Sequence, residues 1–297
     1  MWLRTLAIAA RFLSEHPVVR RAPLRAAISI ARWQAASRLW GGELIVPWIG
    51  NTRLVVQRGM SGATGNVYAG LQEFAEMGFL LHFLRRNEAF ADVGANAGTF
   101  SVLAGGVVGA RVTAVEPIAL AYGRLVRNLG LNGLHDVSAL NVAAGAESSE
   151  ARFTADLDAV NRALGSNEFY DGATVVVPVR PLDEILANTP TMMKIDVEGF
   201  EDAVVRGAAR TLADHRLRAF IIEVLHEAPS ELLAGETVPR FLIALGWQPC
   251  RYDPVTRTLA RDDRPILDGN LLFVRDFDEA QGRLRSAVAF EVFGIDV

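Results

Sequence analysis

The sequence predicts an α/β fold built on a doubly wound parallel sheet. From residue 88 onward, short apolar runs such as FADVG, VTAVE and FIIEV alternate with longer stretches of helical spacing, which is typical of parallel strands buried on both faces. The chain has 297 residues, of which 51% are hydrophobic, so it can bury one large core. No repeat or low-complexity linker divides it. One domain is therefore expected over residues 66–276, followed by a short tail at residues 277–297.

Residues 1–65 are predicted to form an extension of helices and one hairpin. Residues 1–40 carry seven Arg against a single Glu. Apolar residues recur at helical spacing near the start (Trp2, Leu3, Leu6, Ala9, Ala10 and Leu13), which predicts an amphipathic helix. Such a helix packs either on the protein's own core or on an anionic membrane surface. Residues 42–59 then alternate as a short hairpin does, and residues 67–84 are predicted to form one helix.

Seven strands are expected in the main domain. They lie near residues 88–94, 111–117, 137–143, 191–196, 219–225, 248–253 and 270–276. Residues 150–180 interrupt this order with an inserted antiparallel pair, ARFTAD and TVVVPVR. Pro178 predicts an edge position for the second strand of the pair, because proline cannot donate to a sheet.

Two absences in the sequence bear on where the protein works. No run of about 18 uncharged apolar residues exists that would span a bilayer. The single cysteine, Cys250, cannot form an internal disulfide. A cytoplasmic protein is expected, at most peripheral to the inner face of the membrane.

The loop after the first strand of the domain is a candidate binding loop. In FADVGANAGTF, residues 90–100, Gly94 and Gly98 allow a tight turn at the carboxyl end of the strand, where open α/β sheets bind ligands. Asn96 stands where a dinucleotide-binding loop needs glycine beside the pyrophosphate, which disfavours a dinucleotide. Asp92 would repel phosphate but suits a cationic ligand. The predicted cofactor is S-adenosylmethionine, which carries an ammonium and a sulfonium group.

Further residues are expected around that cofactor. Glu116 ends the second strand, where its carboxylate can accept hydrogen bonds from both ribose hydroxyls. Asn141, after the third strand, either binds the base or ribose or only caps the following turn. Tyr68 and Glu73, before the first strand, either close over the methionine end of the cofactor or only pack there.

Several segments together resemble the FkbM-type methyltransferases. They are FADVGANAGTFS, VTAVEP, NLGLN, VRPLDEIL, MMKIDVEGFEDAVVRGA and FIIEVLHE. The resemblance covers residues 66–250. It implies a class I methyltransferase fold, a Rossmann-like seven-stranded sheet of order 3-2-1-4-5-7-6 with the last strand antiparallel. It also implies methyl transfer from S-adenosylmethionine, usually to a hydroxyl oxygen of a sugar or secondary metabolite. Residues 1–60 match no segment of that family.

The fourth strand carries the candidate catalytic residues. Lys194 is the only lysine among 30 basic residues. If the strand stays extended, Lys194, Asp196 and Glu198 share one face, and Lys194 holds one of the two carboxylates ionised. The candidate bases are Asp196 and Glu198, with His226 third and Glu223 orienting the substrate or His226.

Other roles for these carboxylates stay open. Asp196 binds the methionine amino group in one alternative, while Glu198 caps the next helix. In another, Asp196, Glu198 and Glu223 bind a divalent metal ion, because such ions prefer oxygen ligands.

The sequence favours one function over four others. An O-methyltransferase acting on a small-molecule or glycan acceptor is the main expectation. N-methylation, an acceptor linked to lipid with residues 1–40 docked at the membrane, and a non-catalytic cofactor-binding module are alternatives. Nucleic acid is disfavoured as a partner, because the remainder of the chain after residue 40 is acidic and lacks a basic stripe. A homo-oligomer stays open.

Overall fold

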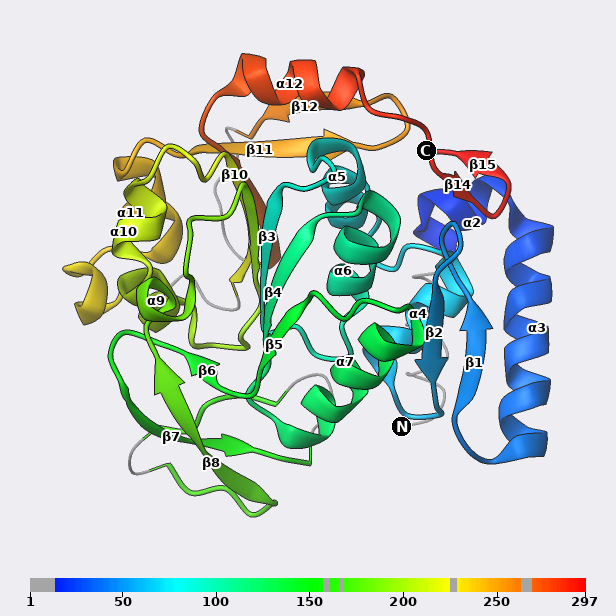
Figure 1. Cartoon of the computed structure of the whole chain (residues 1–297), viewed down its shortest axis with the longest axis horizontal. Coiled ribbons are helices and arrows are strands. Elements are labelled where there is room, and N and C mark those ends of the chain that lie inside the picture. The colour runs from blue at the N-terminus through cyan, green and yellow to red at the C-terminus, as the bar shows by residue number, and fades with distance from the viewer. Residues whose placement is uncertain (1–13, 157–160, 166–167, 225–228, 263–268) are drawn as a thin grey trace.

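A mixed sheet of eight strands forms the centre of the molecule (Figure 1). The computed structural model describes residues 14–156, 161–165, 168–224, 229–262 and 269–297. The strand order is β12-β11-β13-β10-β9-β3-β4-β5. The bounds are β3 (Ala89–Val93), β4 (Arg111–Val115), β5 (Ser138–Leu140), β9 (Met192–Ile195), β10 (Ala219–Val224), β11 (Gln248–Asp253), β12 (Thr258–Arg261) and β13 (Gly269–Val274).

Seven of these strands confirm the predicted order 3-2-1-4-5-7-6. Strands β3, β4, β5, β9 and β10 pair in parallel, and β13 runs antiparallel to β10. The prediction of seven strands was one too few, because β12 pairs antiparallel with β11 at the edge of the sheet. The turn between them, around Asp253, folds the chain back as a hairpin, and Asp253 accepts hydrogen bonds from Val255 and Thr256.

Helices cover both faces of the sheet (Figure 1). One face packs against α8 (Leu182–Ile185), α9 (Glu201–Gly207), α10 (Ala209–Ala213) and α11 (Val238–Ala244), with the short 3₁₀-helix η3 (Glu231–Leu233) beside them. The other packs against α5 (Phe74–Phe83), α6 (Thr99–Val102) with its π-helical continuation η1 (Leu103–Val108), α7 (Ala119–Leu131) and α12 (Phe277–Arg285). Strand side chains alternate between the two cores, so that Phe90 and Met192 join one and Ala91 and Met193 the other.

The predicted helix over residues 67–84 is two helices, α4 (Ser61–Ala69) and α5. Gly70 breaks it with a φ of 79°, a conformation that glycine adopts readily. The Trp48 indole donates to the Gly70 carbonyl at 2.6 Å. The break places Gln72 and Glu73 in a short connection at the carboxyl edge of the sheet, beside the candidate site.

The N-terminal extension contains α2 (Pro17–Arg21), α3 (Pro23–Trp40) and the predicted hairpin, β1 (Leu44–Pro47) with β2 (Arg53–Val56). The amphipathic helix predicted within the first thirteen residues lies outside the described residues. Asn128 of α7 ties the hairpin to the binding loop, because it accepts from the Val55 amide at 2.7 Å and donates to the Ala97 carbonyl at 2.8 Å. No described helix is long and apolar enough to cross a membrane.

The insertion forms a separate small sheet of order β6-β8-β7. It consists of β6 (Ala143–Ala144), β7 (Ser149–Thr154) and β8 (Thr174–Arg180), and β7 and β8 are the predicted antiparallel pair. The edge position predicted for β8 is wrong, since β8 lies in the middle. Proline is tolerated there because β6 pairs only with Val179 and Arg180, so Pro178 lies opposite Glu150 of β7 but just outside the stretch that pairs with β6. The tail ends in a hairpin of β14 (Glu291–Val292) and β15 (Ile295–Asp296).

Candidate functional site

The loop after β3 packs tightly against its neighbours. Gly94 has a φ of 80°, and a Cβ there would overlap the backbone oxygen of Asp196. Gly98 has a φ of 82°, and its Cβ would overlap the Leu125 side chain. Both positions therefore require glycine. The close approach brings the ends of β3 and β9 together and so joins the loop to Asp196.

Glu116, at the end of β4, is held by backbone amides. Its Oε2 accepts from the Asn96 amide at 2.8 Å and its Oε1 from the Ile118 amide at 2.9 Å. Burial raises the pKa of Glu116 to about 7. A carboxylate oxygen has two acceptor sites, so each oxygen keeps one for a ligand. The two remaining sites suit a vicinal diol such as that of ribose.

Lys194 is the centre of a buried charge network. It is 3% exposed, and its Nζ lies 2.5 Å from Asp196 Oδ2, 4.0 Å from Glu73 Oε2 and 4.6 Å from the centre of the Phe100 ring. Burial alone would lower the pKa of Lys194, but Asp196, Glu73 and Asp92 outweigh it and raise that pKa above its usual range. The lysine is therefore a permanent cation in a group of acids.

Asp92 and Asp196 differ although both lie near Lys194. Asp92 is 1% exposed and accepts from the Ser101 hydroxyl at 2.6 Å, and burial raises the pKa of its carboxyl. Burial opposes ionisation of Asp196 as well, but the adjoining Lys194 lowers the pKa of Asp196 below its usual range. Asp196 is therefore the fixed anion of this site.

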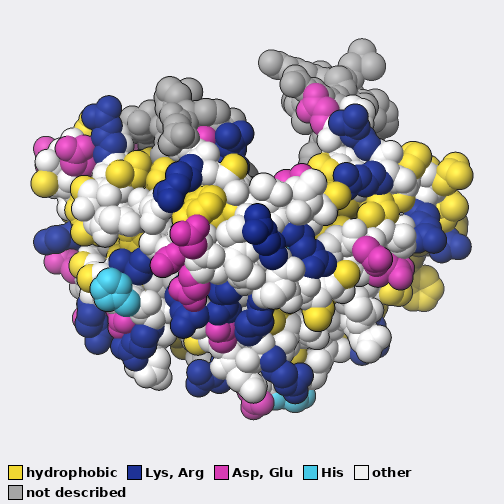
Figure 2. Space-filling model, turned by 90° about the horizontal axis from the view of Figure 1, so that it is seen from above, with side chains coloured by type: hydrophobic (Ala, Val, Ile, Leu, Met, Phe, Trp, Pro, Cys, Tyr) yellow, Lys and Arg dark blue, Asp and Glu magenta, His cyan; other side chains and the backbone are white. Residues whose placement is uncertain are grey.

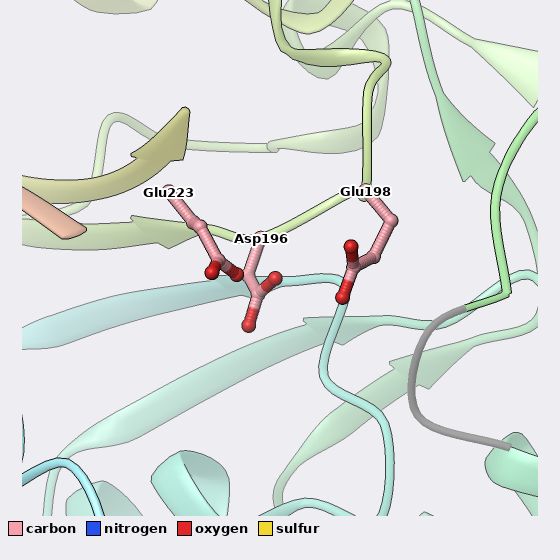
Figure 3. A group of neighbouring side chains, drawn as sticks. All are labelled: Asp196, Glu198 and Glu223. Carbon is pink, nitrogen blue, oxygen red and sulfur yellow. The ribbon is translucent and has the colours of Figure 1, made fainter. Parts of the chain in front are cut away.

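Glu198 and Glu223 complete an acidic cluster with Asp196, and Figure 3 shows the three carboxyl groups turned toward one space. One oxygen of each lies within 4.8 Å of the others. Burial and then the neighbouring Asp196 raise the pKa of Glu198 to about 7. Burial and a hydrogen bond shared with Asp196 raise the pKa of Glu223 above its usual range. Near neutral pH, Glu223 is thus mostly protonated while Glu198 is partly ionised.

Glu198 reaches the cluster by a turn and not by the strand alternation that was predicted. Strand β9 ends at Ile195, and Glu198 has a φ of 52° in the left-handed region. That conformation is costly for a residue other than glycine. Glu198 does not form the helix cap of the alternative interpretation, because α9 begins at Glu201, its N-cap residue is Phe200, and no side chain makes a capping hydrogen bond there.

Two cavities meet at these residues. The first lies over the ends of β3, β4 and β6 and is lined by Glu116, Ile118, Ala144, Phe153 and Phe200, among others. The second, of about 290 Å³, is lined by Gln72, Glu73, Asp92, Lys194, Glu223 and Asn270, among others. Gly94, Asn96, Asp196 and Glu198 line both. An extended ligand that fills both cavities passes between them at Asp196 and Glu198.

The residues present fit S-adenosylmethionine. Glu116 and the apolar wall of the first cavity suit its adenosine, since a ribose diol and a flat base need these partners. The acids of the second cavity suit its ammonium group. Its positive sulfur would lie at the junction, beside Asp196 and Glu198.

The comparison with protein families decides the class. Residues 92–246 match the model of the methyltransferase FkbM domain, which is more than half of the chain. The chain belongs to the FkbM methyltransferase family. Membership implies methyl transfer from S-adenosylmethionine, which agrees with the cavities.

Solved methyltransferases are similar to this FkbM protein at low identity. Methyltransferase FkbM from Methylobacillus flagellatus KT shares 22% identity over 66% of this chain and 47% of that one, with a TM-score of 0.44. TYW2 from M. jannaschii, solved with AdoMet, shares 13% identity over 78% and 84%, with a TM-score of 0.40. The chain thus spans about half the length of the Methylobacillus protein. A comparison with curated proteins gave no match.

Some residues predicted for the FkbM site do not line it. Asn141 donates to the carbonyls of Glu116 and Pro117 at 2.8 and 2.9 Å, which is the turn-capping alternative. The Tyr68 hydroxyl accepts from Gln34 at 2.6 Å, and Tyr68 is not among the described residues that line either cavity. His226 lies outside the described residues.

Other residues were missed by the sequence analysis. Asn270, on β13, lines the second cavity and lies 3.5 Å from Glu73. Phe153 and Phe200 line the first cavity, and their rings meet edge to face. Nothing in the sequence around Asn270 indicates that this residue lies near the loop after β3. The tertiary fold alone brings it there.

A divalent ion has one candidate position in the described part of the chain. It is the cluster of Asp196, Glu198 and Glu223, whose oxygens are ligands that magnesium accepts. Lys194 already contacts Asp196 and supplies a positive charge to the same group.

Proposed function

We propose that the protein transfers a methyl group from S-adenosylmethionine to a hydroxyl oxygen of a sugar, glycan or secondary metabolite. The proposal depends mainly on one observation, the position of Glu198 at the junction of the two cavities. When bound, S-adenosylmethionine supplies an electrophilic methyl group on its sulfur. A hydroxyl is a weak nucleophile until a base accepts its proton, and a carboxylate at the junction is placed to do so.

Glu198 fits the role of general base better than its neighbours. A base works best when its pKa lies near the working pH, and the pKa of Glu198 is raised to about 7. The low pKa of Asp196, paired with Lys194, makes it a weak base. The pKa of Glu223 is raised and this carboxyl shares its hydrogen bond with Asp196. In the part of the chain that the structure describes, no donor occupies the Glu198 carboxylate.

Lys194 and Asp196 have a positioning role in this proposal. Lys194 keeps Asp196 ionised, and this leaves a fixed negative charge that would stabilise the positive sulfur of a bound cofactor. Glu223, protonated, forms a hydrogen bond with the other side of the Asp196 carboxylate.

The same arrangement of Lys194, Asp196 and protonated Glu223 neutralises the acidic cluster without a divalent ion. We therefore expect EDTA to leave turnover unchanged.

The test uses S-adenosylmethionine with a ¹³C-labelled methyl group and fractionated extracts of the source organism. The expected product carries a ¹³C-methoxy signal in its NMR spectrum. A label on nitrogen would replace the hydroxyl acceptor with an amine. Calorimetric binding of the cofactor without any labelled product, across all fractions, would favour a non-catalytic binding module.

A further inference from the structure

Helix α3 carries a second apolar side that no described residue covers. Ala26, Trp33 and Ser37 form its buried side. On the opposite side, exposed residues recur every three or four positions: Leu24, Ile28, Ala31, Ala35 and Leu39. Leu24 is 78% and Leu39 88% exposed. A helix that is apolar on two sides usually has a partner on each. We call these five residues the α3 stripe.

The apolar surface continues beyond the stripe. Trp40, at the end of α3, is 75% exposed, and Ile45 of β1 is 56% exposed. A groove of about 870 Å³ runs between α3, β1 and the β14–β15 hairpin, and Ile28, Ile45 and Trp48 are among its lining residues. The exposed surface is therefore broad and includes an indole at its end, as membrane-interface segments often do.

Arginines surround this surface. Arg25 and Arg32 follow one edge of the stripe and line the groove, and Arg38 follows the other edge. Arg20 and Arg21 of α2 are exposed beside them. Within the described part of the chain, Arg20, Arg21, Arg25 and Arg32 have no acidic partner. Figure 2 shows hydrophobic and basic side chains next to one another at the right edge, the side on which α3 lies in Figure 1.

This combination of charges favours one occupant. A second copy related by a twofold axis would place the stripe and its arginines against themselves, which like charges oppose. A bilayer with anionic phospholipids offers phosphates for the arginines and apolar chains for the stripe, which is how amphipathic interfacial helices bind.

We propose that the α3 stripe, Trp40 and the surrounding arginines dock the protein on the surface of a membrane that contains anionic phospholipids. Helix α4 lies between the docking surface and the candidate site. Its residues Asn66 and Val67 line the groove, and its Gly62 lines the second cavity of the candidate site. Since one helix separates the two, that cavity lies about one helix diameter, roughly 10 Å, from the groove and therefore close to a docked membrane surface. If the proposed function holds, this position suits an acceptor carried on a lipid.

Sedimentation with vesicles tests the docking surface on the full chain. The intact protein is expected to bind vesicles of phosphatidylcholine and phosphatidylglycerol but not vesicles of phosphatidylcholine alone, and added salt should weaken binding. Leu39→Ser with Trp40→Ser should weaken it by about tenfold or more through lost apolar burial. Arg32→Gln should weaken it by about fivefold, because each basic residue near the surface contributes about 1 kcal/mol.

Matched controls separate docking from general effects. Val288→Ser changes an apolar residue that is 69% exposed elsewhere, and Arg240→Gln an exposed arginine of α11. Both should bind as the intact protein does, and thermal unfolding should show every variant folded. Binding unaffected by the α3 variants, or reduced equally by the controls, would overturn the proposal. So would a lack of binding to anionic vesicles.

Two further outcomes are distinguishable. A dimer in light scattering that Leu39→Ser with Trp40→Ser converts to monomer, without vesicle binding, would assign the face to a second copy. Sedimentation needs neither methyl donor nor acceptor, and Glu198→Gln should bind vesicles normally. Failure of docking therefore leaves the proposed function untouched, and failure of methyl transfer leaves docking untouched.

Discussion

Glu116 and Glu198 are carboxyl groups with the same raised pKa of about 7 but opposite surroundings. Both oxygens of Glu116 accept backbone amide bonds. Glu198 has no such bond from a described residue and adopts a left-handed backbone, with a φ of 52°. Burial is the largest cause of both pKa shifts. Only the local bonding tells the two groups apart.

The difference separates binding from proton transfer. A carboxylate fixed by two amides keeps one orientation and is prepared to bind a diol. A carboxylate without fixed donors can accept a proton and turn with its substrate. Backbone strain at such a position is retained where the surrounding structure and function require it. We therefore assign cofactor binding to Glu116 and base catalysis to Glu198.

Glu198→Gln should give the largest effect and affect turnover alone. Loss of a positioned general base typically lowers kcat by about 10²- to 10⁴-fold, whereas affinity for S-adenosylmethionine should change little. Stopped-time assays with labelled cofactor, together with calorimetry, measure both. Glu150→Gln, on an exposed position of β7, is the matched control. Full turnover in Glu198→Gln would move the base to Asp196 or to His226.

Glu116→Ala should weaken binding of the cofactor, whereas Glu198→Gln should lower turnover. It removes two charge-assisted hydrogen bonds to the ribose, each of about 1.5–3 kcal/mol, so the Kd for S-adenosylmethionine should rise by about 100-fold or more. Calorimetry checks this value. Glu116→Gln keeps an acceptor for one amide, so its Kd should lie between that of the intact protein and that of Glu116→Ala. Affinity that is unchanged in Glu116→Ala would place the ribose elsewhere.

The pH dependence of kcat should follow Glu198, and the pH dependence of cofactor affinity should follow Glu116. Glu198 is the active base when ionised, so kcat should rise by about tenfold per pH unit below 7 and level off above it. Affinity for the cofactor should also weaken below pH 7, as Glu116 becomes protonated. Glu198→Gln should remove the rise in kcat and keep the change in affinity. If both changes disappeared together, the two carboxyls would not act separately.

The sequence predicted most of the fold, because hydrophobic period is a local signal. It also located Asp92, Gly94 and Glu116, since each lies at the end of a strand whose pattern is clear. The break at Gly70 was missed because apolar residues keep helical spacing on both sides of it, over residues 67–84. Asn270 and the turn that brings Glu198 to Asp196 depend on contacts between distant strands. The sequence analysis placed Glu198 beside Asp196 by continuing the strand alternation. In the structure the strand has already ended, and the left-handed φ of Glu198 brings it there instead.

The smallest expected effect is on stability, which Glu198→Gly should increase even though it removes the base and so lowers turnover. A left-handed backbone costs a residue with a Cβ about 1–2 kcal/mol, and glycine loses about 0.5–1 kcal/mol through its freer unfolded chain. The free energy of unfolding should thus rise by about 0.5–1 kcal/mol, measured by urea denaturation. Ala234, with a φ of 58° beside η3 and away from both cavities, is the matched control. Ala234→Gly should gain similar stability and keep full turnover, whereas Glu198→Gly should lose it. If Ala234→Gly gained stability and Glu198→Gly did not, the backbone at Glu198 would not be strained. Its left-handed conformation would then give no support to a functional role.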